Sequence, residues 1–214
     1  MKNFLSLDIS YTYFSMSLYT LKNKILINKL CFYKKNISTN NVLFFLFLKS
    51  ILNKTQIDLS EINYISCGTT IGDRTNIKKI KCICKGISCI FNIPILLLSK
   101  LKALALGAWF DYNYSYILSC IKISKTLYNI GIFHFVNKGQ FLHIPTSLIK
   151  ERKITIKNPL FYSAHRHIFT LNQFLYTGKG FLYINRDLCF KPTFFDPERI
   201  PDSIYLLRLS FYFF

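Results

Sequence analysis

One stretch of the sequence decides the fold, and it runs from Ile62 to Phe110: INYISCGTTIGDRTNIKKIKCICKGISCIFNIPILLLSKLKALALGAWF. Its pattern predicts, in order, a strand, a glycine-bearing turn, a helix over residues 76–91, a strand over residues 95–98 and a helix opening at Ser99. Strands that alternate with helices in this way indicate the α/β class.

The predicted helix over residues 76–91 has one apolar face. Its apolar side chains recur at helical spacing, at Ile77, Ile80, Ile83, Cys84, Ile87 and Ile90. Its lysines mostly lie elsewhere and predict a solvated face. Gly86 is unfavourable inside a helix by about 1 kcal/mol, so we expect it to mark close backbone packing. The strand over residues 95–98 is continuously apolar, which is typical of a central strand.

The N-terminal region predicts three strands joined by short turns, over residues 4–8, 13–19 and 24–33. In the second strand, apolar side chains alternate with hydroxyl-bearing ones, so its two faces differ. The turn before the third strand contains Asn23, a residue type that tolerates positive φ. Together the three strands predict a meander.

The segment over residues 41–53 is apolar nearly all round. Its length and the capping residues Asn40 and Asn41 favour a helix, and a fully buried core strand is the alternative. Residues 41, 44, 45, 48 and 52 mark one face of this helix, while Leu43, Leu46 and Phe47 point elsewhere. A helix without a polar face must be buried on two sides. One side would meet the sheet of this chain and the other side would meet another protein.

A change of composition around residues 111–113 suggests a domain boundary. We therefore expect an N-terminal lobe over residues 1–110, which carries the two helices, and a C-terminal lobe over residues 111–214. The second lobe begins with a predicted hairpin, with strands over residues 116–123 and 127–136. Residues 137–201 carry no pattern to which we assign an element.

The chain has 214 residues, a net charge of +18 and 51% hydrophobic residues. Such a charge is typical of proteins that bind nucleic acid, so a basic RNA-binding subunit is one alternative. The other explanation is drift in an AT-rich genome, because residues with AT-rich codons are abundant and the lysines are spread thinly. The sequence also lacks an Arg-rich run, so we favour drift.

Seven cysteines at irregular spacing predict reduced, buried thiols in a cytosol. Cys82 and Cys84 would lie on different faces of a helix, so a metal site is not expected. The apolar run over residues 42–48 ends at Lys49, well short of the ~20 residues that a membrane-spanning helix needs. The start of the chain has no signal-peptide pattern, so we expect a soluble, cytoplasmic protein.

The deciding stretch resembles the bacterial TsaB (YeaZ) family. The family's glycine-rich loop, and the Lys-Gly pair in the helix after it, correspond to Gly68, Gly72, Thr75, Lys85 and Gly86. Residues 104–109 (LALGAW) are similar to the gammaproteobacterial branch. The loop is eroded, since Asp73 and Arg74 replace Ser-Phe, and this suggests a degenerate, endosymbiont-like member. The resemblance covers about residues 3–136 and a closing segment, residues 203–208.

The resemblance implies an α/β fold of the actin-like ATPase (ASKHA, ribonuclease H-like) architecture, with two lobes of mixed sheets flanked by helices. It also implies a non-catalytic subunit in tRNA threonylcarbamoyladenosine modification, beside the anticodon. Such a subunit binds and activates the catalytic subunit TsaD as a heterodimer, joined by a TsaE-type ATPase, with tRNA contacted indirectly. A homodimer is possible when the subunit is alone.

The family pairs through a bundle formed by its first two helices. This places the contact in our chain on eight residues: Leu43, Leu46, Phe47, Ser50, Lys78, Lys81, Cys82 and Lys85. TsaD holds its metal through a pair of histidines on a helix, and this chain has no H-x-x-x-H. We therefore expect no catalytic residue, metal or cofactor in the chain.

The remaining alternative is a degenerate actin-like nucleotide-binding protein. Asp8 and Ser10 stand where actin-like ATPases place a phosphate-facing aspartate and a hydroxyl. Bulky residues follow them, and no glycine precedes Gly68, so we expect Asp8 to have a structural role. The pair His165 and His167 is expected on a surface strand or loop rather than at a metal.

Overall fold

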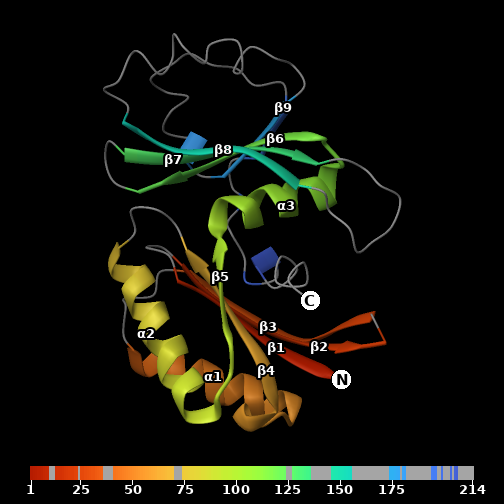
Figure 1. The fold of residues 1–214 in the computed structure, drawn as a ribbon, viewed down its shortest axis with the longest axis vertical. Coiled ribbons are helices and arrows are strands. Elements are labelled where there is room, and N and C mark those ends of the chain that lie inside the picture. Colours follow the sequence, from red (N-terminus) through yellow and green to blue (C-terminus); the bar gives the residue numbers. More distant parts are fainter. Residues whose placement is uncertain are drawn as a thin grey trace. The chain divides into compact units, whose positions relative to one another are not determined.

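The computed structural model holds two five-stranded sheets with helices packed on them (Figure 1). Contacts divide the chain into two units. The first comprises residues 1–69, 73–99 and 202–214, and the second comprises residues 70–72 and 100–201. The structure describes residues 1–9, 13–23, 25–35, 41–69, 74–123, 127–135, 146–155, 174–178, 180–181, 194–196, 199, 203 and 205–206.

The sheet of the first unit confirms the predicted meander and the α/β alternation. Its strands are β1 (Lys2–Ile9), β2 (Tyr13–Lys22), β3 (Ile25–Lys35), β4 (Ile62–Thr69) and β5 (Ile95–Ser99), in the spatial order β3-β2-β1-β4-β5. Strands β1, β2 and β3 pair antiparallel, whereas β4 pairs parallel with both β1 and β5. The connections contain α1 (Asn41–Thr55), the short 3-10 helix η1 (Leu59–Glu61) and α2 (Arg74–Phe91).

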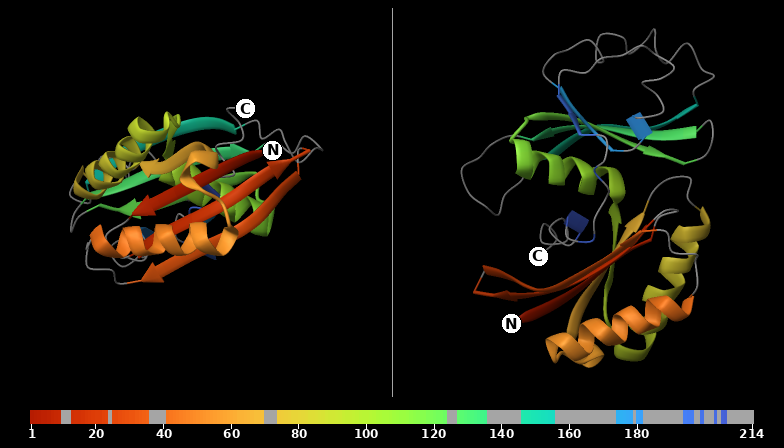
Figure 2. Two further views of the ribbon diagram at one scale, coloured as in Figure 1. Left: turned by 90° about the horizontal axis from the view of Figure 1, so that it is seen from below. Right: turned by 180° about the vertical axis from the view of Figure 1, so that it is seen from behind.

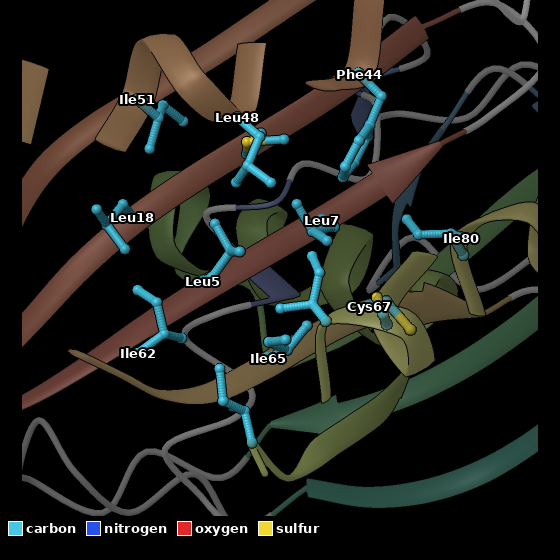
Figure 3. Close-up of a cluster of buried hydrophobic side chains, with 14 of the residues drawn as sticks. Leu5, Leu7, Leu18, Phe44, Leu48, Ile51, Ile62, Ile65, Cys67 and Ile80 are labelled. Atoms are coloured by element: carbon cyan, nitrogen blue, oxygen red, sulfur yellow. The ribbon is translucent and has the colours of Figure 1, made fainter. Parts of the chain in front are cut away.

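Both long helices of the first unit cover the same face of its sheet (Figure 2). Helix α1 packs on β2 and β3, and α2 packs on β1, β4 and β5. The core between sheet and helices is built from aliphatic side chains with a few aromatic rings and cysteines (Figure 3), among them Leu5, Leu7, Leu18, Phe44, Leu48, Ile51, Ile65, Cys67 and Ile80. Burial of this apolar area is the main force that holds both helices to the sheet.

The position of β5 corrects one prediction. Its continuous apolar run suggested a central strand, but β5 is one of the two edge strands of the sheet in the described part of the chain. Leu97 is 51% exposed there. The central strand is β1, which alternates between Leu5, Leu7 and small or polar residues.

The opposite face of the first sheet is lined by small polar side chains that are also buried. Ser6 pairs with Ser17 of β2 and with Ser66 of β4, so the three serines form a row across neighbouring strands. The backbone N–H of Ser203 donates a hydrogen bond to Oγ of Ser15, at 3.1 Å. A segment near the end of the chain therefore packs on this face, where the small side chains permit a close approach.

Residues with positive φ end the three long helices. Gln56, Asn92 and Asn113 adopt φ values of 53°, 52° and 55° directly after or close to the ends of their helices. The left-handed conformation turns the chain away from the helix axis. At the end of the third long helix, the N–H of Asn113 donates a hydrogen bond to the carbonyl of Trp109, at 2.8 Å. Asn23 in the β2–β3 turn has φ of 50°, which confirms the predicted turn.

The second unit is a sheet with one helix packed on it. Helix α3 (Lys100–Tyr112) contacts β6, β7 and β9. The strands are β6 (Tyr116–Lys122), β7 (Leu127–Phe135), β8 (Thr146–Thr155), β9 (Phe174–Thr177) and β10 (Phe194–Asp196), in the order β10-β9-β6-β7-β8. Strands β6 and β7 form the predicted hairpin. Strands β8, β9 and β10 lie in the part of the sequence to which no element was assigned.

Two contacts fix local geometry in the second unit. The Ser119 hydroxyl donates to the carbonyl of Leu101 at 3.0 Å and so ties β6 to α3. Gly178 has φ of +100°, and a Cβ there would lie 2.5 Å from the carbonyl oxygen of Cys120, so only glycine fits. Burial raises the pKa of the Cys120 thiol, which therefore stays neutral.

The contacts divide the chain at other positions than the boundary expected after residue 110. Helix α3 belongs to the second unit, which starts at Lys100 on that side, and residues 202–214 belong to the first. The physical reason is packing: α3 rests on β6, β7 and β9, whereas Ser203 bonds to Ser15 of β2.

Candidate partner-binding surface

Helix α1 presents large apolar side chains to solvent. Phe44, Leu48 and Ile51 are buried against the sheet, at helical spacing. On the opposite side, Phe45 is 55% exposed and Leu46 is 57% exposed. We call the outward-facing side chains of α1 and α2 the helix surface; its exposed members include Phe45, Leu46, Lys49, Asn53, Lys78, Cys82, Lys85, Gly86, Cys89 and Ile90.

The phase of α1 differs from the predicted one at two positions. Residue 45 was assigned to the same face as residues 44 and 48, but it points to solvent. Phe47 was expected to contact a partner, yet it packs against the chain's own core. Its ring lies 5.9 Å from that of Phe14 and 5.6 Å from that of Phe32. Phe47 therefore holds α1 to the sheet.

Helix α2 separates an apolar inner side from a basic outer side, as its sequence predicts. Ile80, Cys84 and Ile87 are buried, while Lys78 and Lys85 are exposed. At the end of the helix, Ile90 is 76% exposed. The outer side of α2 thus combines positive charge with an exposed aliphatic side chain.

Gly86 stands on the outer side of α2 and packs closely on none of the described residues. A Cβ added at Gly86 would meet no atom within 4 Å. The expected close backbone contact is therefore absent from the described part of the chain. An exposed glycine in the middle of a helix lowers helix stability by about 1 kcal/mol relative to alanine.

The cysteines of α2 differ in environment, as predicted for Cys82 and Cys84. Cys84 is buried, and its hydrogen bond with Cys67, followed by its burial, raises the pKa of the Cys84 thiol far above the ordinary value. Cys82 and Cys89 are exposed, so the expectation that all the thiols are buried is wrong for these two. Both exposed thiols belong to the helix surface.

Asp8 lies at the end of β1 and is fully buried. Its Oδ2 accepts a hydrogen bond from the hydroxyl of Tyr13, at 3.0 Å, and Tyr13 begins the next strand. The carboxylate thus joins the two ends of the β1–β2 connection. The other residue of the predicted nucleotide site, Ser10, lies outside the described residues, as do His165 and His167.

The structure brings most of the predicted contact residues to the outer layer of α1 and α2. Leu46, Lys78, Cys82 and Lys85 are exposed, and Ser50 and Lys81 are half-buried. The side chain of Leu43 lies outside what the structure describes. Phe45 and Ile90 are exposed members of the helix surface that were not predicted. For Phe45 a signal existed, because Lys49 and Asn53, one and two turns later, mark the same stripe as solvent-facing.

Comparison with solved structures identifies the fold. The chain is similar to a Pseudomonas aeruginosa protein described as having similarity to peptidase YeaZ, with a TM-score of 0.77 and 19% identity, over 99% of this chain and 91% of that one. It is also similar to YeaZ from Pseudomonas aeruginosa, with a TM-score of 0.76 and 19% identity, over 99% and 92%. The chain has the fold of YeaZ. This confirms the predicted α/β class with two mixed sheets flanked by helices.

The likeness to YeaZ covers 99% of this chain. No protein-family model matches the sequence, and no curated protein matches it. The described residues contain no group of three His, Cys, Asp or Glu side chains placed to hold a metal ion. No helix in the described ranges is both long and apolar enough to cross a bilayer.

Proposed function

We propose that this chain is a TsaB-type subunit that binds and activates a TsaD-type transferase in tRNA threonylcarbamoyladenosine modification. The observation that carries the proposal is the helix surface on a YeaZ fold: Phe45 and Leu46 of α1 expose more than half of their area beside the outer side of α2. In this proposal the chain supplies no catalytic group. It holds the catalytic subunit in an active state, a TsaE-type ATPase joins the complex, and tRNA is reached through TsaD.

The exposed apolar area of α1 favours association with a partner, because its contact with water is unfavourable. Burial of apolar surface contributes about 25 cal/mol per Å², so an exposed Phe and Leu side by side favour association with another surface. The same two helices keep their inner sides in the core of the first unit. A partner can therefore dock on α1 and α2 without rearrangement of the sheet beneath them.

A structural role for Asp8 supports a non-catalytic subunit over a nucleotide-binding one. Nucleotide sites in which phosphates approach the backbone need small residues and free amides. Here the carboxylate of Asp8 is buried and accepts the hydroxyl of Tyr13, a bulky side chain, directly after the connection.

The proposal is tested by co-expression of this chain with the TsaD-type subunit of the same genome. Size-exclusion chromatography with light scattering should show a stable one-to-one complex, and the complex should transfer the threonylcarbamoyl group to tRNA faster than TsaD alone. Two separate peaks, with this chain folded, would contradict the proposal. Binding of ATP and of tRNA by the isolated chain would then be measured next.

Two substitutions of Gly86 are expected to have different effects, one on the stability of the chain and the other on its affinity for the partner. Gly86→Ala should stabilise the isolated chain by about 1 kcal/mol, because alanine is the better helix former and the site is open. Gly86→Leu should also fold, but it should weaken pairing by roughly ten-fold or more, since a bulky side chain keeps the partner away from the helix backbone. Urea unfolding and calorimetric titration measure the two effects.

The two variants at Gly86 are each other's control, because both add a side chain to the same helix position. Equal affinity of the wild type and Gly86→Leu for the partner would show that the partner does not approach α2 at this point. A loss of stability in Gly86→Ala would show instead that the space beside Gly86 is filled within the chain.

A further inference from the structure

A row of lysines runs along the outer side of α2. Lys78, Lys81 and Lys85 follow one another at spacings of three and four residues, so they lie on one side of the helix over about 10 Å. Lys78 and Lys85 are exposed, and Lys81 is half-buried. We call these three residues the lysine row.

The two helices that carry the helix surface contain no acidic residue. Neither the 15 residues of α1 nor the 18 residues of α2 include an Asp or a Glu. Within the described ranges, the structure shows ion pairs of Arg199 with Asp111 and Asp196, which belong to the second unit. All charged side chains of α1 and α2 are therefore positive.

The surroundings of the lysine row favour a protein partner over RNA. Phe45 and Leu46 of α1 and Ile90 of α2 are large, exposed and apolar, and they lie on the same layer of helices. Protein interfaces typically have apolar side chains at the centre and charged side chains around them. Surfaces that bind RNA typically combine positive charge with arginine and aromatic side chains that stack on bases. The only arginine of α2 is Arg74, in its first turn.

The lysine row also disfavours a homodimer in which two copies of this chain pair through α2. In a two-fold symmetric dimer the same patch lies on both sides of the interface. A dimer formed through α2 would bring two lysine rows together without acidic groups between them. Like charges across an interface cost free energy, and opposite charges add to affinity and speed up association.

We propose that the lysine row selects a partner with an acidic helix face and discourages self-pairing through the same surface. This inference rests on the proposed function, and it adds the chemistry that the docking face of the catalytic partner must have. The apolar residues Phe45 and Leu46 supply contact area, and the lysines decide which surface is accepted.

The test measures two kinds of pairing in one triple variant: binding to the TsaD-type subunit and self-association of this chain. Lys78→Gln, Lys81→Gln and Lys85→Gln are combined, since glutamine keeps helix propensity and removes charge. The control is Lys22→Gln, at the exposed end of β2 beside the β2–β3 turn, remote from α2 in Figures 1 and 2. Affinity for the TsaD-type subunit and self-association are measured at about 0.1 M and about 1 M NaCl, where the Debye length falls from about 10 Å to about 3 Å.

The two kinds of pairing should respond in opposite directions. For the wild type, added salt should weaken the heterocomplex by about ten-fold and strengthen self-association. At low salt the triple variant should pair about ten-fold more weakly with the TsaD-type subunit, lose most of its salt dependence and self-associate more strongly. Lys22→Gln should behave like the wild type.

Three results would overturn the inference. A heterocomplex that forms but is insensitive to salt and to the triple substitution would refute the acidic partner face and leave the proposed function standing. Loss of tRNA binding by the triple variant, with pairing unchanged, would assign the lysine row to nucleic acid. Absence of any wild-type complex would refute the proposed function and this inference together.

Discussion

Leu46→Asp is expected to abolish pairing with the TsaD-type subunit and to leave the isolated chain folded. Leu46 is 57% exposed on α1, so a carboxylate there remains solvated in the free chain. In a complex the same carboxylate would be removed from water and placed in an apolar contact, and this desolvation opposes pairing. We expect the affinity to fall by at least about a hundred-fold, measured by calorimetric titration.

The matched control for Leu46→Asp is Ile27→Asp. Ile27 is also exposed and apolar, but it lies on β3 near the β2–β3 turn, outside the helix surface. This variant should pair like the wild type. If both variants lose pairing, the loss comes from the added negative charge and not from its position. If Leu46→Asp pairs normally, α1 is not part of the interface.

Phe47→Asp is expected to destabilise the isolated chain by about 3 kcal/mol, although it neighbours Leu46 in the sequence. The ring of Phe47 packs on Phe14 and Phe32, and the ammonium of Lys34 lies 5.7 Å from its centroid. The substitution removes these contacts and places a carboxylate against the aromatic side chains. Urea unfolding monitored by circular dichroism measures the loss.

Phe45→Asp is the control for Phe47→Asp, because Phe45 lies on the outer side of the same helix. Its free energy of unfolding should stay within about 0.5 kcal/mol of the wild type. A Phe47→Asp variant that is as stable as the wild type but does not pair would show that Phe47 belongs to the interface. Equal destabilisation by both variants would show that α1 is covered on both sides within the chain.

Much of the fold could be predicted from the sequence, since local patterns determine local structure. Period-two alternation in β2, helical spacing in α2 and the turn at Asn23 each identified an element that the structure contains. The order of these elements predicted the α/β architecture. The arrangement of the strands depends on distant pairing, however, and β5 was placed at the centre because its hydrophobicity does not reveal that Leu97 lies at an edge.

The candidate surface was predictable only in part, for a reason that lies in α1 itself. An amphipathic helix such as α2 shows its inner face through its pattern, so the exposed lysines were found. Helix α1 has so few polar residues that its phase rests on Lys49 and Asn53. Phe45 was therefore assigned to the inner face although it is exposed, and the packing of the half-buried Phe47 on the core was not predicted. Small shifts of phase decide which of two neighbouring phenylalanines faces the sheet.

The bond from Ser203 to Ser15 also bears on the order in which the chain folds during its synthesis. It joins positions 188 apart, and Ser203 and Leu206 are both fully buried in the first unit. All residues of the second unit leave the ribosome before this closing segment does. The second unit can therefore complete its sheet first, whereas Ser15 of the N-terminal unit, synthesised earlier, gains its bond from Ser203 only after the whole second unit has been made.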